Sequence, residues 1–171
     1  SAALGASTTV SHTGSLAGSD VLYDALFARL GVARVHDPAA LLETLKLLHV
    51  SGPLTTNTLS SMSCSGGEAS LIADSAVGRK LDFRDLKPQQ LPVLRETLGQ
   101  MVTLSNPLDY HTFVWGNGEK QTTAFTTMMQ GDYALNLVIL DFPRSDRCDP
   151  ADWMTTVNAI IAAKKASGAN A

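Results

Sequence analysis

The sequence has little excess charge and no long apolar segment. Thirteen Lys and Arg residues stand against 16 Asp and Glu residues, the net charge is -3, and the basic residues are scattered along the 171 positions. A nucleic-acid-binding surface requires clustered basic residues, so nucleic acid is not an expected partner. No apolar run is long enough to span a bilayer, and the first residues lack the pattern of a secretory leader. We therefore expect a soluble, cytoplasmic protein without a membrane partner.

Cysteine and metal-ligand patterns are also sparse. Cys64 and Cys148 are the two cysteines, far apart and in dissimilar settings, so a disulfide framework is not expected. The four histidines show neither H-x-x-x-H nor H-E-x-x-H spacing and the cysteines do not form C-x-x-C, so no metal site is expected. The sequence also lacks the G-x-S-x-G elbow of serine hydrolases, the Walker loop and the dinucleotide-binding glycine fingerprint.

Helical and extended patterns alternate along the chain, and 44% apolar content is enough for a domain core. Apolar spacing and capping residues predict helices over 20–30, 38–48, 65–78, 88–98, 119–130 and 149–168. Short apolar runs predict strands at 32–36, 58–64, 80–83, within 101–111 and at 133–142. The alternation indicates an α/β fold with a parallel sheet wrapped by helices.

Three of these segments carry more specific expectations. The run 133–142 is continuously apolar, which is typical of a strand buried on both faces of a parallel sheet. The helix over 65–78 is expected to bury Leu71, Ile72, Ala76 and Val77. A Gly-Pro pair and a change from leucine-rich to Ser/Thr-rich sequence mark residues 50–57 as a domain boundary.

The stretch "SCSGGEASL", residues 63–71, is a candidate phosphate site because it joins a predicted strand to a predicted helix. Ligands of open parallel sheets bind beyond the carboxyl ends of the strands, and helix N-terminal amides favour anions. The same pattern is also typical of a tight connection without a ligand. Cys64, just before the helix, is either a nucleophile with a lowered thiol pKa or a buried, inert side chain.

Two further residues could take part in chemistry. His12 lies in "TVSHTGSLAGSD", where an imidazole nitrogen can attack and carry a phosphoryl group and the glycines let the loop move. Without other information, the favoured interpretation is that His12 is an exposed residue on a pliable segment. Asp109 lies in "SNPLDYHTFVWGNG" and either orients an imidazole, binds a ligand hydroxyl or caps its own turn.

Taken together, these stretches resemble the nucleoside-diphosphate-forming acyl-CoA synthetases, relatives of succinyl-CoA synthetase. The segment over 11–37 resembles the family's phosphohistidine segment, and 63–76 resembles the glycine-led helix that holds the phosphohistidine. "NPLDY" at 106–110 and "DFPRSDRCDPADW" at 141–153 match the later course of the same domain. The resemblance extends over roughly residues 9–165, and its parts occur in the family's order.

The resemblance implies a domain organisation and site roles. Residues 1–50 would be the C-terminal tail of a preceding CoA-ligase domain with the phosphohistidine loop. Residues 51–171 would be a succinyl-CoA ligase-like flavodoxin domain, a three-layer open parallel sheet with helices on both faces. His12 would carry the phosphoryl group. The backbone amides that hold it would be those of Ser65, Gly66 and Gly67.

Two features depart from the family pattern. Many members have a Gly-Gly-Pro-Gly sequence where this chain has "GGEAS", so Glu68 places a carboxylate near the expected phosphate. Glu68 either orients His12 by hydrogen bonding, which makes it a catalytic candidate, or weakens phosphate binding by repulsion. The serine-rich run over 58–64 also lacks the apolar residues usual in a buried strand.

The function implied by the resemblance belongs to a longer parent protein. That enzyme would form acyl-CoA from a small carboxylic acid, CoA and ATP with Mg²⁺, through an acyl phosphate and a phosphohistidine. Its ATP-grasp and CoA-binding domains or subunits would be partners of this chain, and a homo-oligomer is possible. Two alternatives are a non-catalytic regulatory or interaction module of the same fold, and a thiol hydrolase or transferase that uses Cys64.

Overall fold

A computed structural model describes residue 5 and residues 18–171 of the chain. His12, and with it most of the expected phosphohistidine loop, lies outside the described residues. The contacts between residues divide the chain into two units, 1–50 and 51–171, and each is described separately below.

The described part of the first unit contains two helices, α2 (Asp20–Leu30) and α3 (Pro38–Ser51). Helix α2 ends at Gly31, whose left-handed conformation (φ 65°) closes the helix as the sequence predicts. The Asp37 carboxylate accepts a hydrogen bond of 2.8 Å from the Ala40 amide at the start of α3. Both helices therefore begin and end close to the predicted positions.

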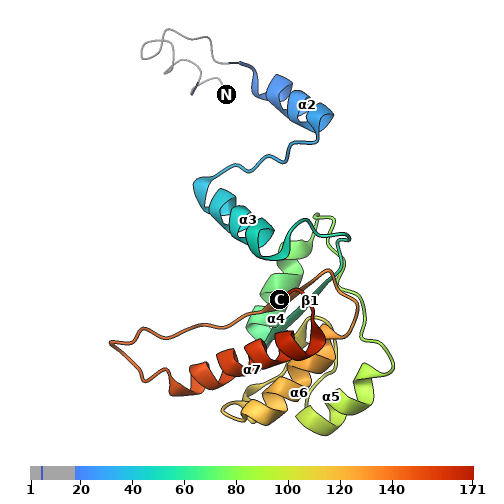
Figure 1. Ribbon diagram of the computed structural model, residues 1–171, viewed down its shortest axis with the longest axis vertical. Coiled ribbons are helices and arrows are strands. Elements are labelled where there is room, and N and C mark those ends of the chain that lie inside the picture. Colours follow the sequence, from blue (N-terminus) through green and yellow to red (C-terminus); the bar gives the residue numbers. More distant parts are fainter. Residues whose placement is uncertain (1–4, 6–17) are drawn as a thin grey trace. The chain divides into compact units, whose positions relative to one another are not determined.

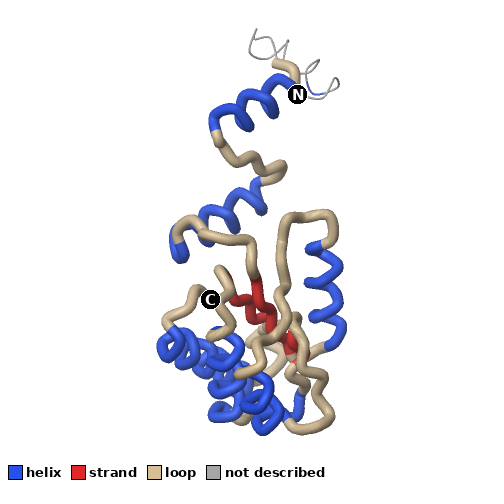
Figure 2. The backbone as a smooth tube through the Cα atoms, turned by 90° about the vertical axis from the view of Figure 1, so that its right-hand side faces the viewer, coloured by secondary structure: helices blue, strands red, loops and turns tan. Residues whose placement is uncertain are grey.

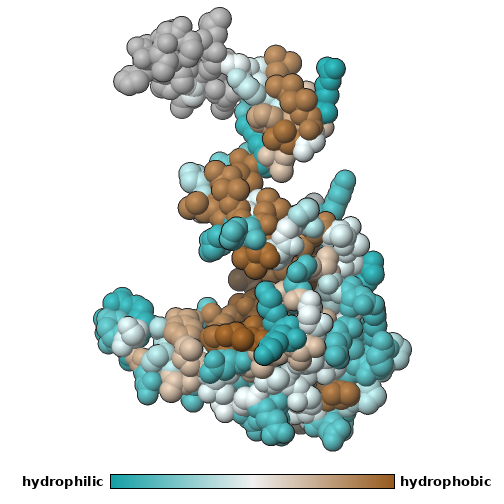
Figure 3. All heavy atoms as spheres, viewed as in Figure 1, coloured by the Kyte–Doolittle hydropathy of each residue, from teal (hydrophilic) through white to brown (hydrophobic). Residues whose placement is uncertain are grey.

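The strand predicted at 32–36 is wrong. These residues form an irregular connection, because no strand lies beside them in the described part of the unit. Arg34 instead donates a 2.6 Å hydrogen bond to Asp20 of α2. Hydrophobic side chains of α2 and α3 are exposed and gather on the surface of both helices (Figure 3). They include Leu22, Leu26, Leu30, Leu41, Leu42, Leu45 and Leu48.

The second unit has three parallel strands, with β1 (Leu59–Ser63) in the middle. It pairs on one side with β2 (Leu108–Asp109) and on the other with β3 (Leu135–Val138). In register, Met62 lies opposite both Leu108 and Val138. Because all three strands are parallel, their carboxyl ends lie at the same edge of the sheet.

Helices cover both faces of this sheet (Figure 2). Helix α4 (Gly66–Ala76) lies on one face, while α5 (Gln90–Leu98), α6 (Gly118–Met129) and α7 (Ala151–Ser167) lie on the other. Helices α6 and α7 run side by side (Figure 1). The predicted α/β architecture, an open parallel sheet with helices on both faces, is confirmed.

Two of the three serine hydroxyl groups of the buried central strand find partners, while Ser61 Oγ has none among the described residues. Ser60 Oγ donates a 2.6 Å hydrogen bond to Asn136 of β3, and Asn136 in turn donates to the carbonyl of Asn170. Ser63 Oγ donates to the Ser65 carbonyl at 3.0 Å. Hydrogen bonding to neighbouring elements thus allows a polar strand to occupy the middle of the sheet.

Two other strand predictions are too long. The segment 80–83 forms one isolated bridge, between Asp82 and Thr58. Of the apolar run 133–142, only Leu135–Val138 is a strand, and Val138 is half-buried rather than enclosed on both faces. The reason is that β3 lies at the edge of the described sheet, with β1 as its partner in the ladder.

The burial predicted for α4 is also wrong in part. Leu71 and Val77 are 68% and 76% exposed, while Ile72 and Ala76 are half-buried. Helix α4 contacts the sheet on one side, and no further layer covers its outer side within the described part of unit 2. A helix in an outer layer buries a narrower stripe than its apolar pattern indicates.

The hydrophobic core lies between the sheet and helices α5, α6 and α7. Tyr110 and Phe125 pack edge to face with ring centroids 5.2 Å apart. Gln121 of α6 donates a buried 2.9 Å hydrogen bond to Thr156 of α7. Fully buried apolar members of the core include Met62, Leu94, Leu108, Phe125 and Met128.

Among the described residues, no helix combines the length and hydrophobicity that crossing a membrane requires.

A pair of leucine substitutions tests this assignment of the core. Leu94 is fully buried in α5, whereas Leu71 in α4 is 68% exposed. We expect Leu94→Ala to lower the free energy of unfolding by about 2–5 kcal/mol, since it removes buried methyl groups and leaves a cavity. Leu71→Ala should change it by about 0.5 kcal/mol or less. Urea denaturation of the two variants measures both effects, and equal losses would contradict the assignment.

Candidate functional site

The loops that follow the three parallel strands meet around one cavity. Its volume is about 600 Å³. Cys64 and Ser65 follow β1, Thr112 lies soon after β2, and Leu140 and Asp141 follow β3. The complete lining is Cys64, Ser65, Glu68, Thr112, Trp115, Leu140, Asp141 and Trp153. Ligands of open parallel sheets bind at this edge, so the cavity is the candidate site.

The N-terminus of α4 points its backbone amides toward the same edge of the sheet. Ser65 precedes the helix in an extended conformation, and no described side chain caps the first turn. Gly66 and Gly67 are exposed. A Cβ atom at Gly66 would lie 3.3 Å from Asp109 Oδ2, so glycine leaves room for the carboxylate beside it. Uncapped amides and the helix dipole can hold an anion such as a phosphoryl group here.

Three carboxylates surround this helix terminus: Glu68 in α4, Asp109 at the end of β2 and Asp141 after β3. Glu68 Oε2 is buried and has no hydrogen-bond partner among the described residues. Burial raises the pKa of Glu68 above its ordinary value, and the Asp141 and Asp109 carboxylates raise this pKa further. The charged form of Glu68 is therefore disfavoured at this position.

Asp109 contacts the loop that follows it. Its Oδ1 accepts a 2.9 Å hydrogen bond from the His111 amide, and its Oδ2 lies 3.5 Å from His111 Nε2. The His111 ring stacks on Phe113 with centroids 5.2 Å apart. Asp109 thus caps its own turn, one of the roles considered from the sequence, and it also lies beside an imidazole and Gly66.

Cys64 and Tyr110 lie near the Glu68 and Asp109 carboxylates. Burial raises the pKa of the Cys64 thiol, and the nearby Glu68 carboxylate raises this pKa further. The Tyr110 side chain is fully buried, and its hydroxyl has no hydrogen-bond partner among the described residues. Burial is also the main cause of the raised pKa of Tyr110. A reactive cysteine requires a lowered pKa, so these surroundings oppose the thiol-dependent alternative.

Sequence reasoning missed four residues of the site: Thr112, Trp153, Asp141 and His111. One signal was available, because Asp141 lies at the carboxyl end of the predicted strand at 133–142 and so at the edge where ligands bind. The position of Trp153, within a helix far along the chain, has no comparable local signal.

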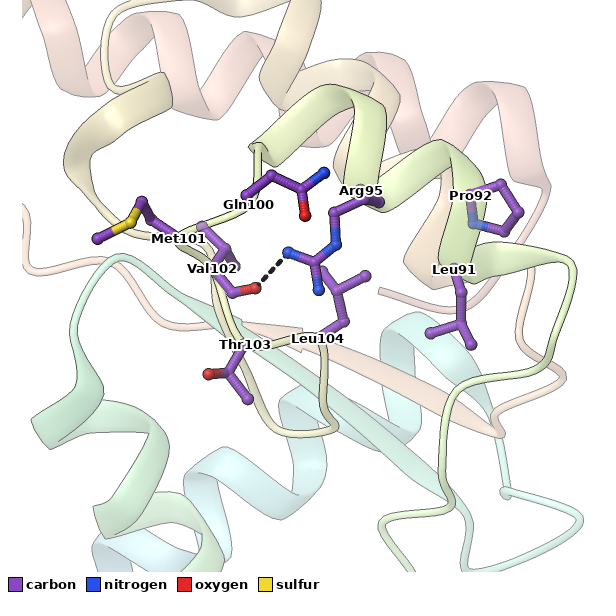
Figure 4. Close-up of a pocket in the computed structure, with 8 residues that line it drawn as sticks. All are labelled: Leu91, Pro92, Arg95, Gln100, Met101, Val102, Thr103 and Leu104. Atoms are coloured by element: carbon purple, nitrogen blue, oxygen red, sulfur yellow. Dashed lines mark hydrogen bonds between the residues drawn. The ribbon is translucent and has the colours of Figure 1, made fainter.

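A second hollow lies away from these residues, between α5 and the loop 100–104 (Figure 4). Its volume is about 640 Å³, and Arg95 extends across it. The Arg95 guanidinium donates hydrogen bonds to the carbonyls of Gly99 and Val102 at 2.8 and 2.7 Å. Arg95 therefore ties the loop to the end of α5, and the hollow contains none of the predicted site residues.

The described residues contain no cluster of three or more His, Cys, Asp or Glu side chains that could hold a metal ion. The structure brings Ser65, Gly66, Gly67, Glu68 and Asp109 together at one edge of the sheet. His12 lies outside the described residues.

Comparisons with known proteins connect this chain to carboxylate–CoA ligases. A family model described as "Succinyl-CoA ligase like flavodoxin domain" matches residues 1–48. This match falls in the first unit, whereas the resemblance led us to expect that domain over 51–171.

Two curated relatives share about a third of the aligned residues. Acetate–CoA ligase [ADP-forming] of Methanocaldococcus jannaschii is 31% identical over 106 residues, which cover 62% of this chain and 15% of that protein. The alpha subunit of acetate–CoA ligase [ADP-forming] II of Pyrococcus furiosus is 33% identical over 106 residues, covering 61% of this chain and 23% of the subunit. The chain thus spans a quarter or less of the curated relatives it matches.

A solved structure shares the fold. It is that of dinucleotide forming acetyl-coenzyme A synthetase 1 from Ca. Korarchaeum cryptofilum, in complex with phosphate and ADP. The TM-score is 0.80 at 17% sequence identity, and the match covers 98% of this chain and 35% of the other.

The crowding of carboxylates predicts a pH-dependent effect of Glu68→Gln on stability. A carboxyl group with a raised pKa binds more protons in the folded than in the unfolded protein, so the free energy of unfolding falls as pH rises through that range. Glutamine does not titrate, so the Glu68→Gln variant does not lose stability in this way. The variant should gain stability relative to the wild-type chain as pH rises above about 4.5, the ordinary value. Urea denaturation across pH measures the difference, and Glu96→Gln at an exposed position of α5 is the control. A pH-independent difference would contradict the assignment.

Proposed function

We infer that this chain is part of an enzyme that makes acyl-CoA from a carboxylic acid, CoA and ATP. The chain belongs to the nucleoside-diphosphate-forming acyl-CoA synthetase superfamily, which includes succinyl-CoA synthetase. The inference is supported by the similarity to two ADP-forming acetate–CoA ligases and by the shared fold. The acid is proposed to be small. The relatives are much longer than this chain, which supports the proposal that the activity resides in a longer protein.

The proposed reaction passes one phosphoryl group along three acceptors. The γ-phosphoryl group of ATP, which Mg²⁺ accompanies, moves to the His12 imidazole and ADP leaves. A carboxylate oxygen of the acid then takes the phosphoryl group from His12, which gives an acyl phosphate. The CoA thiol attacks the acyl carbon and inorganic phosphate leaves, so acyl-CoA is formed and His12 is free again.

The observation that carries this proposal is the uncapped N-terminus of α4 at the edge where the three strand ends meet. In the proposal, the amides of Ser65, Gly66 and Gly67 hold the phosphoryl group on His12, and the helix dipole stabilises its charge. Gly66 and Gly67 are exposed, which supports access by a loop that moves between sites.

Glu68 and Asp109 are proposed to orient the imidazole. The Glu68 carboxyl group can hydrogen-bond an imidazole nitrogen, and its raised pKa indicates that its surroundings oppose the charged form. Of the two roles that the sequence allows for Glu68, the structure therefore supports orientation over repulsion. Asp109 already lies beside one imidazole, that of His111, at 3.5 Å.

The proposed domain organisation places residues 1–50 at the C-terminal end of a preceding CoA-ligase domain and residues 51–171 in a flavodoxin-like domain. The family match at 1–48 and the division of contacts after residue 50 support this boundary. ATP-grasp and CoA-binding domains or subunits are the proposed partners, with homo-oligomerisation as a further possibility. Cys64 and Cys148 are free cysteines, as is typical of a cytoplasmic enzyme.

Labelling the complete parent protein with γ-labelled ATP tests the role of His12. We expect acid-labile, alkali-stable label on the peptide that contains His12, because a phosphoimidazole has these stabilities. His12→Asn should reduce the label to background and ligase activity on the order of 10³-fold or more, since it removes the nucleophile. His36→Asn, at an exposed position, is the matched control and should retain both.

Two outcomes would overturn the proposal. Full ligase activity in His12→Asn would mean that another residue carries the phosphoryl group. Absence of label in a parent protein that still binds nucleotide would favour the alternative of a regulatory or interaction module with this fold.

A further inference from the structure

The apolar wall of the cavity at the strand ends is aromatic. Trp115 and Trp153 pack edge to face, with ring centroids 5.3 Å apart and an angle of 80° between the planes. Trp153 is held in place by the 2.7 Å hydrogen bond from its Nε1 to the main-chain carbonyl of Asp141. Leu140 extends the same wall. Indole rings accept flat or apolar groups, and their faces attract cations.

The opposite wall carries two carboxyl groups and no basic side chain. Glu68 and Asp141 both line the cavity, and none of the eight lining residues is Lys, Arg or His. Neither carboxylate has an ion-pair partner in the part of the chain that the structure describes. Glu68 Oε2 in addition is buried and lacks a hydrogen-bond partner among those residues. The cavity therefore combines two carboxyl groups with two tryptophans.

Charge complementarity separates the possible classes of ligand. An anion in the cavity would face both Glu68 and Asp141, which is unfavourable at short range. A neutral apolar molecule would leave Glu68 and Asp141 facing each other without a counter-charge. A cation on an apolar body satisfies both walls, because the carboxylates pair with its charge while the indoles cover its body. It would also relieve the repulsion between Glu68 and Asp141.

We propose that this cavity binds a small organic cation, an ammonium or guanidinium group carried on a flat or apolar body. Glu68 and Asp141 are its anionic partners, and Trp115 and Trp153 form the aromatic wall. The site adjoins the proposed anion position: Ser65 and Glu68 line the cavity, whereas Gly66 and Gly67 do not. Because it does not involve His12, its failure and the failure of the phosphohistidine proposal are distinguishable.

Tryptophan fluorescence of the 171-residue chain tests the proposal directly. The sequence has two tryptophans, and both line this cavity, so the emission reports on the site. The probes are phenethylamine, 2-phenylethanol and phenylacetate, which have similar bodies and differ in charge. Phenethylamine should give a saturable change, and the neutral and anionic probes should bind at least about ten-fold more weakly.

Two conservative substitutions assign the charge recognition. Glu68→Gln and Asp141→Asn should each weaken phenethylamine binding roughly ten-fold and leave 2-phenylethanol unaffected, since they remove a charge and retain the shape. Asp141→Asn also keeps the main-chain carbonyl that holds Trp153. Glu96→Gln, exposed on α5, is the control and should bind like the wild-type chain. Phenylacetate binding as tightly as phenethylamine, or no saturable change with phenethylamine, would overturn the proposal.

Discussion

The candidate site depends on the parallel pairing of β1 with a strand on each side. This pairing places the residues that follow β1, β2 and β3 at one edge of the sheet, although the first and last of these loops are more than 70 positions apart in the sequence. Two carboxyl groups, those of Glu68 and Asp141, and the two tryptophans reach the cavity from these loops or the helices next to them. Because parallel strands require long crossover connections, α4 and α6 are as necessary to the site as the residues that line it.

The site is also unusual in the balance of its charges. A helix N-terminus favours anions, yet Glu68, Asp109 and Asp141 converge around this one. The exposed amides belong to Gly66 and Gly67, with Asp109 beside Gly66, while Glu68 and Asp141 face the cavity. One edge of the sheet therefore has helix amides that favour an anion and, next to them, carboxyl groups that favour a cation. This arrangement suits a reaction that brings together groups of different charge.

The sequence predicts much of this arrangement, and the errors have physical causes. Helix positions followed from local signals such as Asp37-Pro38 and Gly31, and the loop at 63–71 was found because it joins a strand to a glycine-led helix. The strand at 32–36 and the burial of Leu71 were wrong because both depend on neighbours that a single sequence does not reveal. Trp153 was missed for the same reason, because its place beside Trp115 arises from the packing of α7 against α6.

The end of the described chain has a protective consequence for the sheet. The Asn136 amide of β3 donates to the Asn170 carbonyl at 2.9 Å, and the Asn170 side chain donates to Ala134 at 3.3 Å. These bonds occupy hydrogen-bonding groups that an edge strand otherwise presents to solvent. Residues after α7 thus cover part of the edge of β3. This disfavours the addition of a strand from another molecule and so opposes edge-to-edge aggregation.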